Sequence, residues 1–251
     1  MKCLILGAGY ATRLYPLTKD RPKPLLPVGG VPILERICEQ VFKVKDIDAV
    51  HIVTNHKFAS HYWKWLHDYQ QRRSLPVPID IFDDMTMTPE DRLGAIGDTQ
   101  FVIKHAGIDD DLLLIAGDNL LLFPLQGFVD QARAKGTSVC LKDLGDKKLV
   151  SLYGAVSVDG SGKVVGFEEK PPQPKTTLVS IGAYVFARAH IPLFKKFLDQ
   201  GQGKDAPGYY LQWLHRQIDV YGYVLEGDWY DIGDLESYNR ANEMMTESTR
   251  S

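Results

Sequence analysis

Most of the functional information lies in Cys3-Leu4-Ile5-Leu6-Gly7-Ala8-Gly9-Tyr10-Ala11-Thr12-Arg13 and in the following Arg21-Pro22-Lys23-Pro24. The apolar run predicts a buried strand, and the glycine-rich turn after it lets backbone N–H groups approach a phosphate. Arg13 and Lys23 stand ten residues apart on a segment that prolines stiffen. Two fixed cations beside backbone donors suit a polyphosphate whose charge shifts during a reaction.

A glycine-rich turn after a first strand is also typical of dinucleotide-binding folds. This chain has Thr12 where the third glycine of that motif would stand. The next expected strand, 49–54, runs into Asn55-His56-Lys57, so no acidic residue is placed to bind a ribose. Because Arg13, Thr18 and Pro22-Lys23-Pro24 are also present, we discount the dinucleotide interpretation.

Composition limits the classes of protein that fit. The 251 residues are enough for one substantial α/β domain. A net charge of −3 argues against a broad nucleic-acid-binding surface. Cys3, Cys38 and Cys140 are widely spaced, which predicts reduced structural thiols. The first strand leaves no room for a signal peptide, and no apolar run approaches the roughly 20 residues of a membrane span. We therefore expect a soluble, cytoplasmic protein without a membrane or nucleic-acid partner.

Strands and helices alternate in the first half of the chain. The apolar patterns predict strands at 2–6, 49–54, 79–82 and 112–116, and helices at 32–42, 58–71 and 94–105. Such alternation predicts parallel strands with helical crossovers on both faces. The second half has strand-like segments at 138–141, 154–158, 164–168, 179–186 and 221–225, and helices near 191–200, 209–217 and from 235. We expect an α/β three-layer sandwich with a mostly parallel, Rossmann-like mixed sheet.

The N-terminal motifs resemble the signature of the sugar nucleotidyltransferases, or nucleotide-sugar pyrophosphorylases. The matching segments are the glycine turn, Thr12-Arg13, Pro16-Leu17-Thr18 and Pro22-Lys23-Pro24-Leu25. The resemblance covers the whole chain, is greatest to short thymidylyl- and uridylyltransferases, and implies the nucleotide-diphospho-sugar transferase fold. It implies one domain over 1–251, with a nucleotide-binding half (1–120) and a sugar-phosphate-binding half (121–251), and no C-terminal β-helix. The chain departs from the family at Ala11, where glycine is usual.

The resemblance also assigns the nucleotide site. It implies Arg13 and Lys23 as catalytic residues, and it implies nucleotide binding by Leu6, Gly7, Ala8, Gly9, Thr12, Arg13, Lys23 and Gly94. The segment Arg92-Leu93-Gly94-Ala95-Ile96-Gly97-Asp98 stands where the family contacts the base, but its Arg92 and Asp98 depart from the common pattern. Uridine, thymidine, cytidine and guanosine nucleotides all stay open.

Asp118 follows the apolar run 112–116, where a carboxylate is costly unless it meets a cation or a helix N-terminus. An isolated Gly-Asp would more often cap a turn. The resemblance implies that Asp118 and Asp231 hold a catalytic Mg²⁺, an ion that keeps several waters and accepts phosphate oxygens. Asp231 lies in Trp229-Tyr230-Asp231-Ile232-Gly233-Asp234, whose last residue we expect to cap the next helix.

The acceptor site is implied by Gly154, Glu169, Lys170 and Tyr184, which match family positions that bind the sugar phosphate. A Glu-Glu-Lys run alone is more typical of a solvated strand end, and Tyr184 alone fits core packing nearly as well. In the implied roles, Glu169 accepts hydrogen bonds from sugar hydroxyls and Lys170 neutralises the acceptor phosphate.

These assignments predict a Mg²⁺-dependent nucleotidyltransferase that couples an NTP to a sugar 1-phosphate and releases pyrophosphate. One alternative is the same chemistry on a non-sugar phosphate such as phosphocholine. Another is a non-catalytic regulatory paralogue, against which the presence of Arg13, Lys23, Asp118 and Asp231 argues. The base, the sugar and whether the chain forms a homo-oligomer stay open.

Overall fold

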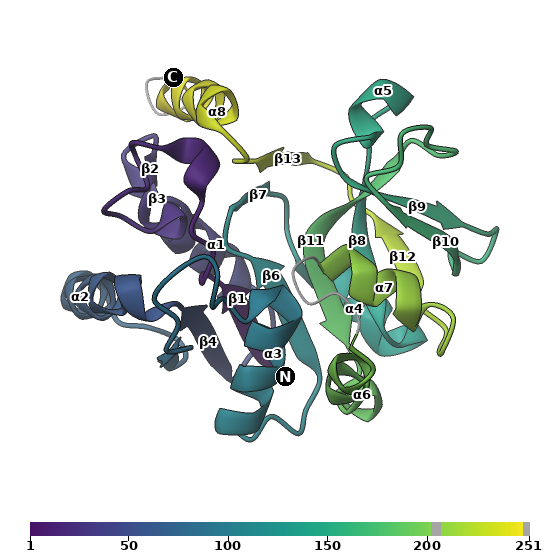
Figure 1. The fold of residues 1–251 in the computed structure, drawn as a ribbon, viewed down its shortest axis with the longest axis horizontal. Helices are drawn as coiled ribbons and strands as arrows, with labels where there is room; N and C mark the ends of the chain where they lie inside the picture. Colours follow the sequence, from purple (N-terminus) through teal and green to yellow (C-terminus); the bar gives the residue numbers. More distant parts are fainter. Residues whose placement is uncertain (202–206, 248–251) are drawn as a thin grey trace.

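A central mixed sheet organises the protein, whose computed structural model describes residues 1–201 and 207–247. The sheet runs in the order β10-β9-β11-β6-β1-β4-β5, with β8 pairing with β11 and β12 (Figure 1). Its strands are β1 (Lys2–Leu6), β4 (Ala49–Thr54), β5 (Ile79–Asp83), β6 (Leu112–Ala116), β8 (Ser138–Asp143), β9 (Gly154–Val158), β10 (Val164–Glu169), β11 (Leu178–Phe186) and β12 (Tyr221–Val224). Strands β6, β1, β4 and β5 are parallel, and β11 is antiparallel to β6. The sheet is therefore mixed and mostly parallel, as predicted from the sequence.

Helices cover both faces of the sheet because successive strand residues point to opposite sides. Cys3 and Ile5 belong to one core with residues of α1 (Ile33–Val41), α2 (His56–Arg72) and α4 (Gln126–Lys135). Leu4 belongs to a second core with residues of α3 (Gly94–His105), α6 (Leu193–Asp199) and α7 (Pro207–Leu214). The expected three-layer sandwich is therefore confirmed. Within the described ranges no helix is both long and apolar enough to cross a bilayer.

Several elements were not predicted from the sequence. They are α4, α5 (Lys147–Val150), the short pair β2 (Pro27–Val28) and β3 (Val31–Pro32), and a second small sheet of β7 (Asn119–Leu122) and β13 (Asp228–Asp231). Figure 1 shows β13 crossing above β7 on its way to α8 (Leu235–Glu247). The helix expected at 209–217 begins at Pro207 and ends at Leu214. The expected absence of a β-helix concerns the chain end and lies outside the described residues.

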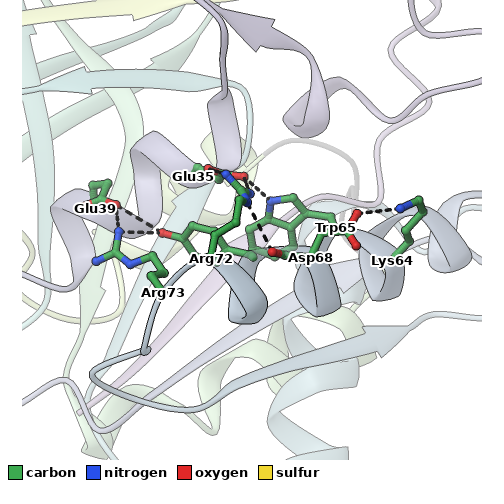
Figure 2. A network of polar contacts seen from close by, with 8 residues as sticks. Glu35, Glu39, Lys64, Trp65, Asp68, Arg72 and Arg73 are labelled. Atoms are coloured by element: carbon green, nitrogen blue, oxygen red, sulfur yellow. Dashed lines mark hydrogen bonds and ion pairs between the residues drawn. The ribbon is translucent and has the colours of Figure 1, made fainter.

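A buried carboxylate joins α1 to α2 (Figure 2). Glu35 of α1 is 6% exposed and accepts hydrogen bonds from Trp65 Nε1 at 3.0 Å and Arg72 Nη2 at 2.5 Å. Its neighbour Glu39 pairs with Arg73 in the same network. Because a buried carboxylate is costly without partners, Trp65 and Arg72 fix how the aromatic helix α2 packs against α1.

We predict that Glu35→Ala destabilises the protein by about 2–4 kcal/mol, because it leaves the Trp65 N–H buried without an acceptor. Urea denaturation measures the change. Lys64→Ala is the control: it removes an exposed pair with Asp68 on the same helix, worth about 0.5 kcal/mol or less. Equal losses in the two variants would show that the Glu35 contacts do not hold the helices together.

Candidate active site

The loop after β1 is held in place by its neighbours. The Gly7 N–H donates to the Val53 carbonyl at 2.8 Å, and Tyr62 Oη donates to the Gly7 carbonyl at 3.0 Å. Asn55 Nδ2 donates to the Ala8 carbonyl at 2.8 Å. These contacts come from β4 and α2 and its N-cap, so the loop is preorganised by the fold, which favours electrostatic binding of a charged group.

The two glycines of this loop serve different purposes. A Cβ on Gly7 would lie 2.5 Å from Tyr62 Oη, whereas a Cβ on Gly9 would meet nothing within 4 Å. Gly7 is therefore required by packing, and Gly9 leaves an open backbone surface for a ligand. Ala11, where the family usually has glycine, adopts the left-handed conformation with φ 47°, and its carbonyl accepts from Thr18 Oγ1 at 2.7 Å. The Thr18 contact helps to hold a conformation that costs alanine about 1–2 kcal/mol.

Lys23, Asp118 and Asp231 gather at the carboxyl end of β6. Lys23 is 7% exposed, and its Nζ lies 2.9 Å from Asp118 Oδ2. The Ile232 N–H donates to the Asp118 carbonyl at 3.1 Å, which brings the end of β13 beside Asp118. Burial, together with the Asp118 carboxylate, raises the pKa of Asp231 to about 6, although Lys23 and Arg13 oppose the rise. Asp118 thus has the cation that the sequence required, and a second carboxylate lies close to it.

This carboxylate pair suits a hard divalent cation. In the part of the chain that the structure describes, no cluster of three or more His, Cys, Asp or Glu could hold a metal. The raised pKa of Asp231 reflects first its burial and then the nearby Asp118 charge, and a cation would stabilise both carboxylates. Two oxygen ligands leave positions for waters and phosphates, the coordination that Mg²⁺ prefers. Asp234 is engaged elsewhere: its Oδ1 accepts from the Ser237 N–H at 2.9 Å at the start of α8, as predicted for a helix cap.

Two cavities meet beside this cluster. The larger, about 600 Å³, is lined by every residue predicted to bind the nucleotide, namely Leu6, Gly7, Ala8, Gly9, Thr12, Arg13, Lys23 and Gly94. The smaller, about 430 Å³, is lined by the predicted acceptor and metal residues Gly154, Glu169, Lys170, Tyr184, Asp118 and Asp231. Arg13, Asp118 and Lys170 line both. The fold therefore brings all of these side chains together, while their individual roles stay predictions.

Glu169 is a half-buried acid of the smaller cavity. Burial raises its pKa, and the neighbouring Lys170 partly counteracts this. A Cβ on Gly154 would lie 3.2 Å from Glu169 Oε2, and a Cβ on Gly208 would overlap the same carboxylate. Tyr184 is 4% exposed and packs in the core, and it also lines the cavity, so its role in binding an acceptor stays a prediction.

Asn119 and Gly208 are among the residues of the smaller cavity that the sequence analysis did not identify as site residues. Asn119 lies opposite Asp231 in the β7–β13 ladder, and its Oδ1 accepts from Trp229 Nε1 at 2.8 Å. Its place directly after Asp118 was a signal that could have identified it. Gly208 lies in the first turn of α7 and approaches Glu169 only through the fold, so no pattern near it in the sequence points to the site.

The raised pKa of Asp231 predicts a pH-dependent stability. The native protein binds this proton more tightly than the unfolded chain, where the pKa is about 3.9. Stability linked to Asp231 is therefore full below about pH 4 and falls as the pH rises through 6. Asp231→Asn should raise the free energy of unfolding at pH 8 by on the order of 2 kcal/mol and change it little at pH 4.

Urea denaturation in EDTA at the two pH values measures this difference. Asp234→Asn is the matched control, because hydrogen bonds to Ser237 lower the pKa of Asp234 and the sign is opposite. A gain for Asp231→Asn that is the same at both pH values would refute the assigned electrostatics.

The comparisons with known proteins agree with the fold and the motifs. The bifunctional protein GlmU of Methanocaldococcus jannaschii is 27% identical over 246 residues, which are 98% of this chain and 54% of the relative. The UTP–glucose-1-phosphate uridylyltransferase of Synechocystis is 27% identical over 250 residues, covering 96% of this chain and 62% of the relative. The chain thus spans between half and two thirds of the length of these curated relatives.

Solved structures show the same fold. A UDP-glucose pyrophosphorylase complexed with UDP-glucose superposes with a TM-score of 0.82 at 20% identity, covering 98% of both chains. The UDP-glucose pyrophosphorylase of Acinetobacter baumanii gives 0.81 at 18% identity, covering 99% of this chain and 96% of the other. The sequence itself matches the nucleotidyl transferase family over residues 2–248. The chain belongs to the nucleotidyl transferase family.

Proposed function

We propose that this protein is a Mg²⁺-dependent nucleotidyltransferase that couples an NTP to a sugar 1-phosphate, giving a nucleotide sugar and pyrophosphate. The observation that carries the proposal is the junction of the two cavities at Arg13, Asp118 and Lys170. A transfer between two substrates needs both reacting phosphates at one point, and this junction places cations and a carboxylate there. The Synechocystis relative is named for UTP and glucose 1-phosphate, which supports an NTP and a sugar 1-phosphate as the substrate class.

In the larger cavity, the open backbone at Gly9 and the guanidinium of Arg13 would hold the β- and γ-phosphates. Lys23, fixed by its ion pair with Asp118, would lie between the α-phosphate and the incoming phosphate. An acceptor phosphate oxygen attacks the α-phosphorus in line. The bond to the β-phosphate oxygen breaks, and its electron pair leaves with pyrophosphate. The acceptor is already ionised, so no covalent enzyme intermediate is needed, and catalysis consists of positioning and charge stabilisation.

Asp118 and Asp231 are the residues that would hold Mg²⁺. When bound there, the ion would neutralise charge that develops on the phosphates. The burial of Asp231 and the repulsion between the two carboxylates fit this role, because a bound cation would offset both unfavourable effects.

On the acceptor side, Glu169 would accept hydrogen bonds from vicinal sugar hydroxyls, and Lys170 would bind the sugar phosphate. Phosphocholine is the second candidate acceptor. It is favoured by the rings of Tyr153 and Trp229, which pack at 5.3 Å in the smaller cavity and could bind a quaternary ammonium.

The test is a pyrophosphate-release assay of each NTP against a panel of sugar 1-phosphates and phosphocholine. We expect release with a sugar 1-phosphate, its loss in EDTA and its return with Mg²⁺. Lys23→Ala and Arg13→Ala should each lower turnover by about 100-fold or more, because each removes a preorganised charge partner. Lys19→Ala, an exposed lysine between them in the sequence, is the control and should stay active. No release with any pair would reject the function, and normal turnover by Lys23→Ala would remove that residue from the mechanism.

Glu169→Gln should raise the KM for the sugar 1-phosphate by about 10-fold or more and leave that for the NTP nearly unchanged, a pattern of lost acceptor binding. Steady-state kinetics with each substrate varied in turn measure the split. Glu168→Gln is the matched control, because that neighbouring side chain is exposed and pairs with Lys175. A Glu169 variant that loses NTP affinity while keeping acceptor affinity would contradict the assignment.

A further inference from the structure

The carboxylate of Glu169 lies between the backbones of two glycines. Glu169 ends β10 and is paired with Gly154 of β9 in the antiparallel ladder. A Cβ on Gly154 would lie 3.2 Å from Glu169 Oε2, and a Cβ on Gly208 would overlap the same oxygen. The carboxylate therefore fills the space that a side chain at position 208 would need.

The first turn of α7, which carries Gly208, is held in place by the core below it. Tyr210 is fully buried in the second core, where its ring stacks on Phe194 with the centroids 4.5 Å apart. Leu214, one turn further along, is also fully buried. Because protein cores are close-packed, α7 cannot move away from β10 without losing these contacts. A larger residue at position 208 would instead displace the end of the Glu169 side chain.

Neither the backbone nor the helix explains a glycine at position 208. Its φ lies outside the left-handed range that favours glycine. Within a helix glycine is less favourable than alanine, because it loses more conformational freedom on folding. A Cβ there would also lie 3.1 Å from Phe167 Cε1, a contact that a small shift of the ring relieves. The overlap with Glu169 is therefore the feature that accounts for the missing side chain.

The place of this carboxylate matters because it faces a ligand site. Glu169 and Gly208 both line the smaller cavity. Burial raises the pKa of Glu169, so hydrogen bonds from the hydroxyl groups of a ligand would stabilise its charged form. Such bonds weaken steeply when the distance or the angle changes, so a displaced carboxylate would lose them.

We propose that Gly208 is a positioning residue for the acceptor: without a side chain there, α7 leaves the Glu169 carboxylate where the sugar hydroxyls bind. This proposal rests on the proposed function. The group that an alanine would displace is the end of a flexible side chain, so the fold should tolerate the change. Acceptor binding can therefore be separated from folding at this position.

Gly208→Ala in the full chain tests the proposal, with the NTP and sugar 1-phosphate that release most pyrophosphate. We expect kcat/KM for the acceptor to fall by about 10-fold or more while the KM for the NTP changes by less than about twofold. Urea denaturation should show an unchanged midpoint. Gly160→Ala is the matched control, because that exposed glycine has open space where its Cβ would lie, and it should leave all three quantities unchanged.

A double-mutant cycle with Glu169→Ala separates displacement of the carboxylate from any other effect of the added methyl group. In the Glu169→Ala background there is no carboxylate to displace, so Gly208→Ala should change kcat/KM for the acceptor by less than about twofold. An equal loss in both backgrounds, or no loss with Glu169 present, would overturn the role of Gly208.

Crystal structures of the unmodified protein and of Gly208→Ala give a readout that needs no activity. We expect the Glu169 carboxylate to lie in a different place in the variant, and an unmoved carboxylate would overturn the proposal. If the unmodified protein released no pyrophosphate with any pair of substrates, the proposed function would be rejected, and the role of Gly208 toward an acceptor with it.

Discussion

The antiparallel pairing of β7 with β13 is the constraint on which the rest of the site depends. Asp231 follows Asp118 by 113 residues in the chain, and this ladder brings the two carboxylates together. The hydrogen bond from the Ile232 N–H to the Asp118 carbonyl fixes the end of the ladder, and the bond from Trp229 to Asn119 fixes its register. A slip of one residue would turn Asp231 to the opposite face and separate the pair.

Holding two carboxylates together is unfavourable, and the surrounding structure compensates only in part. The buried Lys23 pairs with Asp118, but the pKa of Asp231 still rises to about 6. The site therefore stores an electrostatic strain that a bound cation would relieve, as expected where function conflicts with stability. The glycine loop contributes in a different way, because its contacts with Val53 and Tyr62 order it before any phosphate binds.

The sequence predicted the elements whose signal is local. The strands 49–54 and 112–116 are continuous apolar runs because both faces of the sheet are covered, and their bounds were predicted without error. Strands β7 and β13 were not predicted, because each has only four residues and the two form a separate two-stranded sheet. Such short segments show no recognisable hydrophobic periodicity. The sequence motifs identified most of the candidate site residues, but they did not show how distant elements bring these residues together. Gly208, for example, approaches Glu169 only through a contact between elements that are distant in the sequence.

In the reaction that we propose, both substrates react directly at the junction of the two cavities, and the protein carries no nucleotidyl group. Exchange of labelled pyrophosphate into the NTP, measured with and without the sugar 1-phosphate, tests this most directly. Exchange is expected only when the acceptor is present, because labelled pyrophosphate can enter the NTP only by reacting with the nucleotide sugar. Exchange without the acceptor would mean that the protein itself carries the nucleotidyl group, and it would contradict the claim.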